Sequence, residues 1–271
     1  MQGADMNIAI TGVSGKMGQT LVRASLEDNS VKLTAAIDRP GSPLIGKDAA
    51  ILLGKKTEVI VSDDMDEIKK ANCLIDFSRP HGTLTHLEYC LKHKINIVIG
   101  TTGFSKDELK TIKNASTKIA IVHSSNMSIG VNVTFKLVEI AAKMLNSGYD
   151  AEIFEAHHKD KIDSPSGTSI TMGEAIASAW NVPLSDVATW TRHGNIGARK
   201  PGTIGFSVLR GGDIIGDHKA YFCGKGETIE VAHHSGSRDG YASGALLAST
   251  FLKDKQSGYY NMADVLNLNS Y

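Results

Sequence analysis

The chain has 271 residues, and its 29 Lys and Arg residues balance 29 Asp and Glu residues, so its formal net charge at neutral pH is zero. This balance gives no overall attraction to nucleic acid or an anionic membrane, and no apolar run approaches the ~20 residues that cross a bilayer. Residues 1–5 lack the basic and apolar regions of a signal peptide, and either Met1 or Met6 could start translation. The three cysteines form no C-x-x-C pair, which favours a cytoplasmic protein without a disulfide framework or a metal site.

Short apolar segments alternate with segments of helical composition through the first half of the chain. The expected strands are residues 7–11, 31–37, 59–61, 73–77, 95–99 and 119–122. Strands of a parallel sheet are nearly continuously apolar because helices cover both faces of the sheet. The pattern therefore predicts an α/β domain with a parallel sheet.

The pattern changes after about residue 128. The segments expected there are a helix at 131–145, a strand ending at residue 154, a helix from about 168, β-rich segments at 204–209, 218–223 and 228–233, and a helix at 242–252. Glycine-rich turns at 211–213 and 224–226 predict hairpins between the β-rich segments. We expect residues 129–238 to form an inserted α+β domain with a mixed open sheet, and residues 239–271 to return to the first domain, 1–128.

A glycine turn follows the first expected strand, with the spacing G-x-x-G-x-x-G at Gly12, Gly15 and Gly18. Such glycines permit a tight turn, close approach of the backbone to a pyrophosphate, and close packing of helix on strand. Asp38 ends the second strand, where an acidic side chain binds ribose hydroxyls, and Arg39 could accept a 2′-phosphate. The first domain is therefore predicted to be Rossmann-type and to bind NADH or NADPH. An ordinary strand-to-helix turn with a surface Asp is the alternative.

Small residues follow the strand at 95–99, in the order Gly100, Thr101, Thr102 and Gly103. They stand at the edge where open α/β sheets bind ligands, and their exposed amides suit a nicotinamide carboxamide. Residues 126–128 follow the last strand of the first half and are expected to line the same cleft.

The segment 155–168 concentrates titratable groups at the end of a strand. It carries His157, His158 and Lys161, followed by the predicted helix start Ser166-Gly167-Thr168. Imidazole titrates near neutrality and suits a general acid, lysine is a point cation, and the N–H groups of a helix start attract anions. The segment therefore indicates a site that protonates and holds a small carboxylate, with a solvated polar loop as the alternative.

A second histidine pair, His233-His234, lies in an expected strand. Adjacent residues of a strand point to opposite faces of the sheet, so these two cannot easily bind one metal ion. We interpret them as structural, with at most one reaching the substrate.

These motifs together resemble the 4-hydroxy-tetrahydrodipicolinate reductase family, also called dihydrodipicolinate reductases. The most specific element is the segment 155–168, which is similar to the family signature E-A/L-H-H-x-x-K-x-D-A-P-S-G-T. The similarity extends over residues 7–268, with supporting segments at 12–18, 76–80, 100–104, 126–132 and 201–206. Two positions depart from the family: Ser164 replaces the commoner alanine, and Met127 stands where better-known members have phenylalanine beside the nicotinamide. The second departure bears on cofactor affinity and substrate inhibition, and not on the reaction.

The resemblance implies hydride transfer from NADH or NADPH to an unsaturated cyclic dicarboxylate. It implies that His157 protonates the carbon next to the hydride acceptor, with Lys161 assisting in the same catalytic site. His158, Lys161 and the amides of Gly167 and Thr168 would hold the substrate carboxylates. The second domain would carry both the substrate site and the contacts of a homotetramer.

The residues expected to bind the cofactor come from the glycine turn, the end of the second strand and the loops after later strands. They are Gly12, Gly15, Lys16, Met17, Gly18, Asp38, Arg39, Phe77, Arg79, Gly100, Thr101, Thr102, Gly103, Ser125, Asn126 and Met127. Two other functions remain open at this point. Another nicotinamide-dependent dehydrogenase would share the glycine turn but not the His-His-x-x-Lys segment, and a non-catalytic dinucleotide sensor would need no titratable loop.

Overall fold

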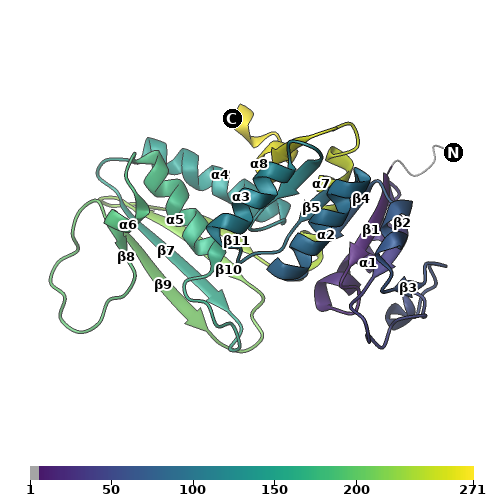
Figure 1. Cartoon of the computed structure of the whole chain (residues 1–271). Coiled ribbons are helices and arrows are strands. Elements are labelled where there is room, and N and C mark those ends of the chain that lie inside the picture. Colours follow the sequence, from purple (N-terminus) through teal and green to yellow (C-terminus); the bar gives the residue numbers. More distant parts are fainter. Residues whose placement is uncertain (1–5) are drawn as a thin grey trace. The chain divides into compact units, whose positions relative to one another are not determined.

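The computed structural model describes residues 6–271, so the expectation about a signal peptide in residues 1–5, and Met1 as a start, lie outside the described residues. The chain divides into two compact units (Figure 1). Unit 1 consists of the residues up to Ile129 together with Arg238–Tyr271, and unit 2 consists of Gly130–Ser237. Each unit is built around its own β-sheet.

Unit 1 contains a parallel seven-stranded sheet in the order β12-β6-β5-β4-β1-β2-β3. Its strands are β1 (Met6–Thr11), β2 (Val31–Ile37), β3 (Val61–Ser62), β4 (Cys73–Asp76), β5 (Asn96–Ile99), β6 (Ala120–His123) and β12 (Gly258–Tyr260). Its helices are α1 (Lys16–Glu27), α2 (Pro80–His93), α3 (Lys106–Ala115), α7 (Asp239–Phe251) and α8 (Met262–Val265). The strand order 3-2-1-4-5-6 is that of doubly wound dinucleotide-binding folds, which confirms the predicted Rossmann-type sheet.

The sheet of unit 1 is covered on both faces. Ile8 and Ile10 of β1 point into one hydrophobic core and Ala9 points into the other, because successive side chains of a strand alternate between faces. Residues of α1 and α7 belong to the first core, and residues of α2 and α3 to the second. Helix α7 packs beside α1 in this first core.

Unit 2 contains a mixed five-stranded sheet in the order β11-β10-β7-β9-β8. Its strands are β7 (Asp150–His157), β8 (Ala188–Thr189), β9 (Ile204–Arg210), β10 (Asp217–Cys223) and β11 (Thr228–His234), and its helices are α4 (Ile129–Met144), α5 (Gly167–Ala179) and α6 (Leu184–Val187). β7 is parallel to β9 and antiparallel to β10. Apolar residues of α4 and α5 pack with those of the central strands in a third core. The predicted mixed sheet is confirmed.

Two local predictions differ from the structure. The turn at 211–213 was expected to join β9 and β10 in a hairpin, but β7 lies between these two strands. The hairpin predicted at 224–226 does form, and it joins β10 to β11. Turn residues mark where a chain reverses, and they do not determine which strand becomes the neighbour. The strand expected at 59–61 is also shorter and shifted, since β3 covers Val61–Ser62 and Ile60 makes an isolated bridge with Asp48.

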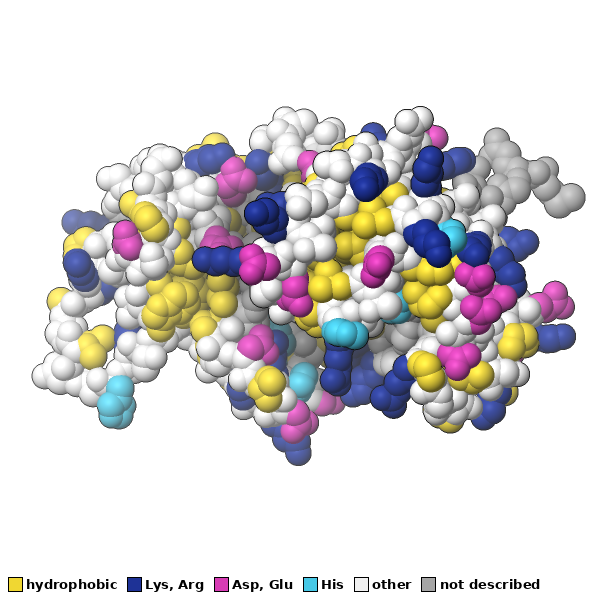
Figure 2. Space-filling view, in the orientation of Figure 1, with side chains coloured by type: hydrophobic (Ala, Val, Ile, Leu, Met, Phe, Trp, Pro, Cys, Tyr) yellow, Lys and Arg dark blue, Asp and Glu magenta, His cyan; other side chains and the backbone are white. Residues whose placement is uncertain are grey.

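The surface carries charges of both signs. Figure 2 shows Lys and Arg side chains interspersed with Asp and Glu side chains over the visible face, as the balanced composition predicts. Among the described residues, no helix is both long enough and apolar enough to cross a membrane.

Candidate active site

The glycine turn of unit 1 has the geometry that close packing of backbone requires. Gly12 has a φ of 65°, and the N–H of Gly15 donates to its carbonyl oxygen at 2.9 Å. A Cβ at Gly18 would lie 2.2 Å from that same oxygen, so only glycine permits α1 to pack this closely on the turn. The cap of α1 is Gly15, which has no side chain to bond the first N–H groups of the helix. This arrangement suits a pyrophosphate at the helix start.

Asp38 is held against the glycine turn. Its Oδ2 accepts the N–H of Ser14 at 2.7 Å, and its Oδ1 accepts the N–H of Arg39 at 2.8 Å. The side chain is buried, at 7% exposure, whereas Arg39 is exposed. Each carboxylate oxygen has a second lone pair, so Asp38 can still accept bonds from ribose hydroxyls.

The other expected cofactor residues follow the carboxyl ends of parallel strands, which meet at one edge of the sheet. The Phe77 ring fills the place of a Gly100 side chain, since a Cβ there would lie 2.2 Å from Cε1 of the ring. Thr101 is buried, and the exposed members of the set are Lys16, Arg79, Thr102, Gly103 and Ser125. Met127 lies in the core of unit 1 and is 1% exposed as a whole residue. Its expected contact with the cofactor stays a prediction.

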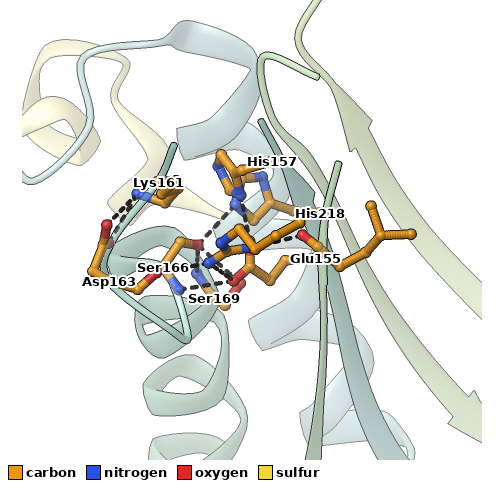
Figure 3. Close-up of polar contacts among 9 residues, drawn as sticks. Glu155, His157, Lys161, Asp163, Ser166, Ser169 and His218 are labelled. Carbon is orange, nitrogen blue, oxygen red and sulfur yellow. Dashed lines mark hydrogen bonds and ion pairs between the residues drawn. The ribbon is translucent and has the colours of Figure 1, made fainter. Parts of the chain in front are cut away.

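The end of β7 in unit 2 holds a buried cluster around His157 (Figure 3). Glu155 and His157 are two residues apart on one strand and therefore share a face of the sheet. Glu155 stands opposite His218 of β10, and His157 stands opposite Arg210 of β9. Glu155 bonds to Nδ1 of His157, and its Oε1 accepts Nη2 of Arg210 at 2.9 Å and the N–H of Ser166 at 3.0 Å.

The electrostatics of this cluster assign the proton positions. Burial favours a higher pKa for Glu155, but bonds from His157 and Arg210 outweigh it and lower the pKa from 4.5 to about 2. Glu155 is therefore ionised at neutral pH and accepts the proton of His157 Nδ1, which leaves Nε2 as the nitrogen for proton transfer. Burial, with the nearby charge of His157, lowers the pKa of His218 to about 4, so His218 is neutral at pH 7.

The space beside His157 Nε2 is kept open by a glycine. A Cβ at Gly216 would lie 3.1 Å from Nε2, whereas the ring of His218 packs edge-on at a centroid distance of 5.0 Å. Nε2 of His218 lies 3.1 Å from Oγ of Ser166. These contacts hold the His157 ring between a fixed carboxylate and a second imidazole.

Lys161 lies in the loop after β7 and is paired with Asp163. Its ammonium nitrogen donates to the two carboxylate oxygens of Asp163 at 2.7 and 2.8 Å, and its side chain is 21% exposed. A substrate carboxylate would have to share this ammonium with Asp163. His158, the next residue after β7, is partly exposed, and its carbonyl oxygen accepts the N–H of Lys161 at 3.2 Å.

Helix α5 begins at Gly167, so Gly167 and Thr168 occupy its first turn as expected. The cap is Ser166, whose Oγ accepts the N–H of Ser169 at 3.3 Å. Because Ser166 also donates its N–H to Glu155, the helix start and the His157 cluster share one hydrogen-bond network.

The structure adds contacts of His157 that the sequence did not predict. Glu155, Arg210, His218 and Ser166 complete its surroundings. Ser166 was expected only as part of a helix start and Glu155 only as the first residue of the segment 155–168, and no motif indicated Arg210 or His218. Single ligand atoms of Glu155, His157 and His218 lie within 4.8 Å of one another, which is compatible with a metal site. The Arg210 guanidinium on the same carboxylate opposes a second cation, so we interpret the cluster as a proton-transfer site.

The two residues of the second histidine pair, His233 and His234, have different neighbours. His233 stands opposite His218 in the sheet, and burial, together with the charge of His234, lowers its pKa. His234 is exposed, and its Nδ1 lies 3.1 Å from the Asp217 carboxylate.

Comparison with known families accounts for nearly the whole chain. Residues 6–127 match the family described as dihydrodipicolinate reductase, N-terminus, and residues 130–266 match dihydrodipicolinate reductase, C-terminus. A solved structure of dipicolinate-bound dihydrodipicolinate reductase from Paenisporosarcina sp. TG-14 is similar, with a TM-score of 0.73 and 25% identity. The similarity covers 94% of this chain and 97% of that one.

Curated relatives are closer in sequence. The chain is 57% identical to the 4-hydroxy-tetrahydrodipicolinate reductase of Bordetella pertussis over 98% of this chain and 99% of the relative. It is 52% identical to the corresponding reductase of Burkholderia pseudomallei, with the same two coverages. These findings confirm the resemblance inferred from the motifs, and the chain belongs to the dihydrodipicolinate reductase family of NAD(P)H-dependent oxidoreductases.

Proposed function

We propose that the protein reduces 4-hydroxy-tetrahydrodipicolinate to tetrahydrodipicolinate with NADH or NADPH, in the diaminopimelate route to lysine. The observation that carries this proposal is the buried Glu155–His157 pair, which lies beside Lys161 and the start of α5 in a chain 57% identical to such a reductase. In this proposal, residues 1–128 and 239–271 bind the cofactor. Residues 129–238 bind the substrate.

The cofactor supplies the hydride, and the residues of unit 1 fit its binding. The glycine turn and the start of α1 receive the pyrophosphate, and Asp38 accepts the ribose hydroxyls. Arg39 is exposed next to Asp38 and can pair with the 2′-phosphate of NADPH. The loops at 77–79, 100–103 and 125–127 bind the nicotinamide half.

The residues of unit 2 supply the proton and hold the substrate. The 4-hydroxyl group of the substrate first leaves as water, which creates a conjugated double bond in the ring. Hydride then adds to one carbon of that bond, and His157 Nε2 gives its proton to the neighbouring carbon. The Glu155 carboxylate at Nδ1 stabilises the protonated imidazole before the transfer. Lys161, His158 and the amides of Gly167 and Thr168 hold the two carboxylates of the substrate.

The proposal is tested by an assay with freshly generated substrate. Aspartate semialdehyde, pyruvate and the preceding synthase produce the unstable substrate, and the purified protein is added with NADH. Rapid substrate-dependent loss of NADH absorbance, with tetrahydrodipicolinate identified by mass spectrometry, is expected. A protein that binds NADH but does not oxidise it would favour a dinucleotide sensor. Oxidation with amino-acid or keto-acid substrates alone would favour another dehydrogenase.

Lys161 provides a test of substrate anchoring. Pyridine-2,6-dicarboxylate is a planar analogue of the unsaturated ring, and calorimetric titration into the enzyme–NADH complex measures its affinity. Lys161→Ala should weaken its binding, because a cation near one carboxylate is lost, and should leave the NADH dissociation constant unchanged. Lys159→Ala is the control, since Lys159 is an exposed cation of the same loop. Equal inhibitor affinity in wild type and Lys161→Ala would remove Lys161 from the site.

We also propose that the protein is a cytoplasmic homotetramer assembled through unit 2. One face of its sheet packs against α4 and α5, and the strand alternation turns Phe154, Leu209 and Tyr221 to the opposite face. Leu209 is 40% exposed in the single chain, and apolar groups exposed on a sheet face are stabilised by burial against another copy. Light scattering of the purified protein should give four times the chain mass of 29.0 kDa, whereas a monomer would contradict the assembly.

A further inference from the structure

A buried carboxylate in unit 1 connects two of the loops that follow the parallel strands. Asp76 is the last residue of β4 and is 0% exposed. Its Oδ1 accepts the N–H of Ser78 at 2.7 Å and lies 3.5 Å from the Thr101 hydroxyl. Its Oδ2 lies 2.6 Å from Nδ1 of His86 on α2. One side chain therefore bonds to the loop after β4, the loop after β5 and a helix.

The partners of Asp76 keep it charged. Burial favours a higher pKa for this carboxyl group, but the bond and charge of His86 and the bonds from Ser78 outweigh burial and lower the pKa. A buried carboxylate is costly unless its oxygens have hydrogen-bond donors, so any movement of these loops away from Asp76 is penalised. The loops therefore have one preferred arrangement.

Further contacts join the same two loops. The N–H of Gly100 donates to the Asp76 carbonyl oxygen at 2.9 Å, and Thr83 of α2 donates its hydroxyl proton to Thr101 Oγ1 at 2.9 Å. Phe77 occupies the space where a side chain at Gly100 would lie. The loops at 77–79 and 100–103 are thus packed together, and both are expected to bind the nicotinamide half of the cofactor.

We propose that Asp76 is a positioning residue for the nicotinamide half of NADH and NADPH. It is too deeply buried to contact the cofactor and acts through Ser78, Thr101 and His86, which it holds in the binding arrangement. This inference rests on the proposed function, because that function identifies the ligand. A residue with only a stabilising role would not change the binding of one half of the cofactor selectively, whereas Asp76 is expected to change the binding of the nicotinamide half alone.

The test compares whole cofactors with ADP-ribose, which lacks the nicotinamide. In Asp76→Asn, an amide group replaces one acceptor oxygen and cannot accept all the bonds that the carboxylate accepts. Fluorescence or calorimetric titration should show NADH and NADPH binding weakened about tenfold, the size of effect expected when buried donors lose their acceptor. ADP-ribose affinity should stay at the wild-type value.

A matched control lies at the other end of the same sheet. Asn96 begins β5 and bonds to three backbone groups, those of Ala120, Leu252 and Lys255, at 2.9–3.1 Å. Asn96→Ala therefore removes a comparable bridging side chain from the amino edge of the sheet. It should lower the melting temperature and leave the affinities for NADH and ADP-ribose unchanged.

A second variant keeps the inference testable if Asp76→Asn does not fold. His86→Leu removes the partner of Asp76 Oδ2 and is not among the residues expected to bind the cofactor, so it should weaken NADH and leave ADP-ribose affinity unchanged. Wild-type affinity for NADH in whichever of the two variants folds, or an equal loss of NADH and ADP-ribose affinity, would overturn the inference. A wild-type protein that binds NADH but does not reduce the substrate would instead overturn the proposed function alone.

Discussion

Glu155 contributes to the site through charge and through position. The carboxylate lies two residues from His157 on β7 and is bonded to Arg210 and to the start of α5. A fixed anion at Nδ1 sets the tautomer of the imidazole and stabilises its protonated form, as an orienting carboxylate does in other acid–base sites.

Replacing Glu155 with Gln should lower kcat by roughly 10–10²-fold, part of the 10²–10⁴ that a placed proton donor contributes. The NADH dissociation constant should be unchanged, because Glu155 lies in unit 2. Glu152→Gln is the control: Glu152 is on the same strand, faces the opposite side of the sheet and is also paired with an arginine, Arg192. Equal loss of kcat in both variants would assign the Glu155 effect to general disturbance of β7.

The pH dependence of stability provides a separate prediction. The folded-state pKa of Glu155 is about 2, below its usual 4.5, so ionised Glu155 stabilises the fold above about pH 4.5, and this contribution is lost as pH falls toward 2. Thermal melts of wild type and Glu155→Gln should therefore differ most near neutral pH and converge as pH approaches 2. A constant difference across this window would show that the carboxylate is not held in the ionised form.

Arg39 should determine the affinity for NADPH relative to the affinity for NADH. It is exposed beside Asp38 and can pair with the extra phosphate of NADPH, so we expect the wild type to use both cofactors without a strong preference. Arg39→Ala should weaken NADPH much more than NADH in direct titrations. Equal losses for both would show that Arg39 does not reach the 2′ position.

Some of these residues could be predicted from the sequence, and others could not. The glycine turn, Asp38 and the His157 segment are local motifs with defined spacing, and the structure holds Asp38 against the turn. Arg210 and His218 are about 50 and 60 residues from His157 and meet the cluster through strand register, which a single sequence does not specify. The burial of Met127 in the core of unit 1 also results from tertiary packing, which no local motif predicts.

At the scale of elements, glycine positions and strand composition were the informative signals. Alternating apolar strands and helices predicted the parallel sheet of unit 1, because each strand must be buried on both faces. The order of strands in unit 2 was less predictable: β7 inserts between β9 and β10, and turn residues carry no information about that choice.

Gly18 tests the close packing of α1 on the glycine turn. The Cβ added by Gly18→Ala would lie 2.2 Å from the Gly12 carbonyl oxygen, so the start of α1 must move. We expect a destabilisation of about 1–3 kcal/mol, typical of overpacking, together with weaker binding of NADH. Gly236→Ala is the control, since a Cβ there has no neighbour within 4 Å and the residue has no positive φ. Equal denaturation midpoints for the two variants would contradict the packing role of Gly18.

At the scale of the whole molecule, the chain joins two compact units that differ in sheet type. Membership of the dihydrodipicolinate reductase family confirms the function inferred from the motifs. The roles of individual residues, the tetramer and the division of labour between the units remain predictions.

The measurement that tests the central claim most directly is the steady-state kinetics of His157→Gln with NADH and freshly generated substrate. If His157 is the general acid, kcat should fall by roughly 10²–10⁴-fold, because the placed proton donor is lost. The NADH dissociation constant, measured on the same preparation, should match that of the wild type. A near-normal kcat would contradict the assignment and make His158 the candidate acid.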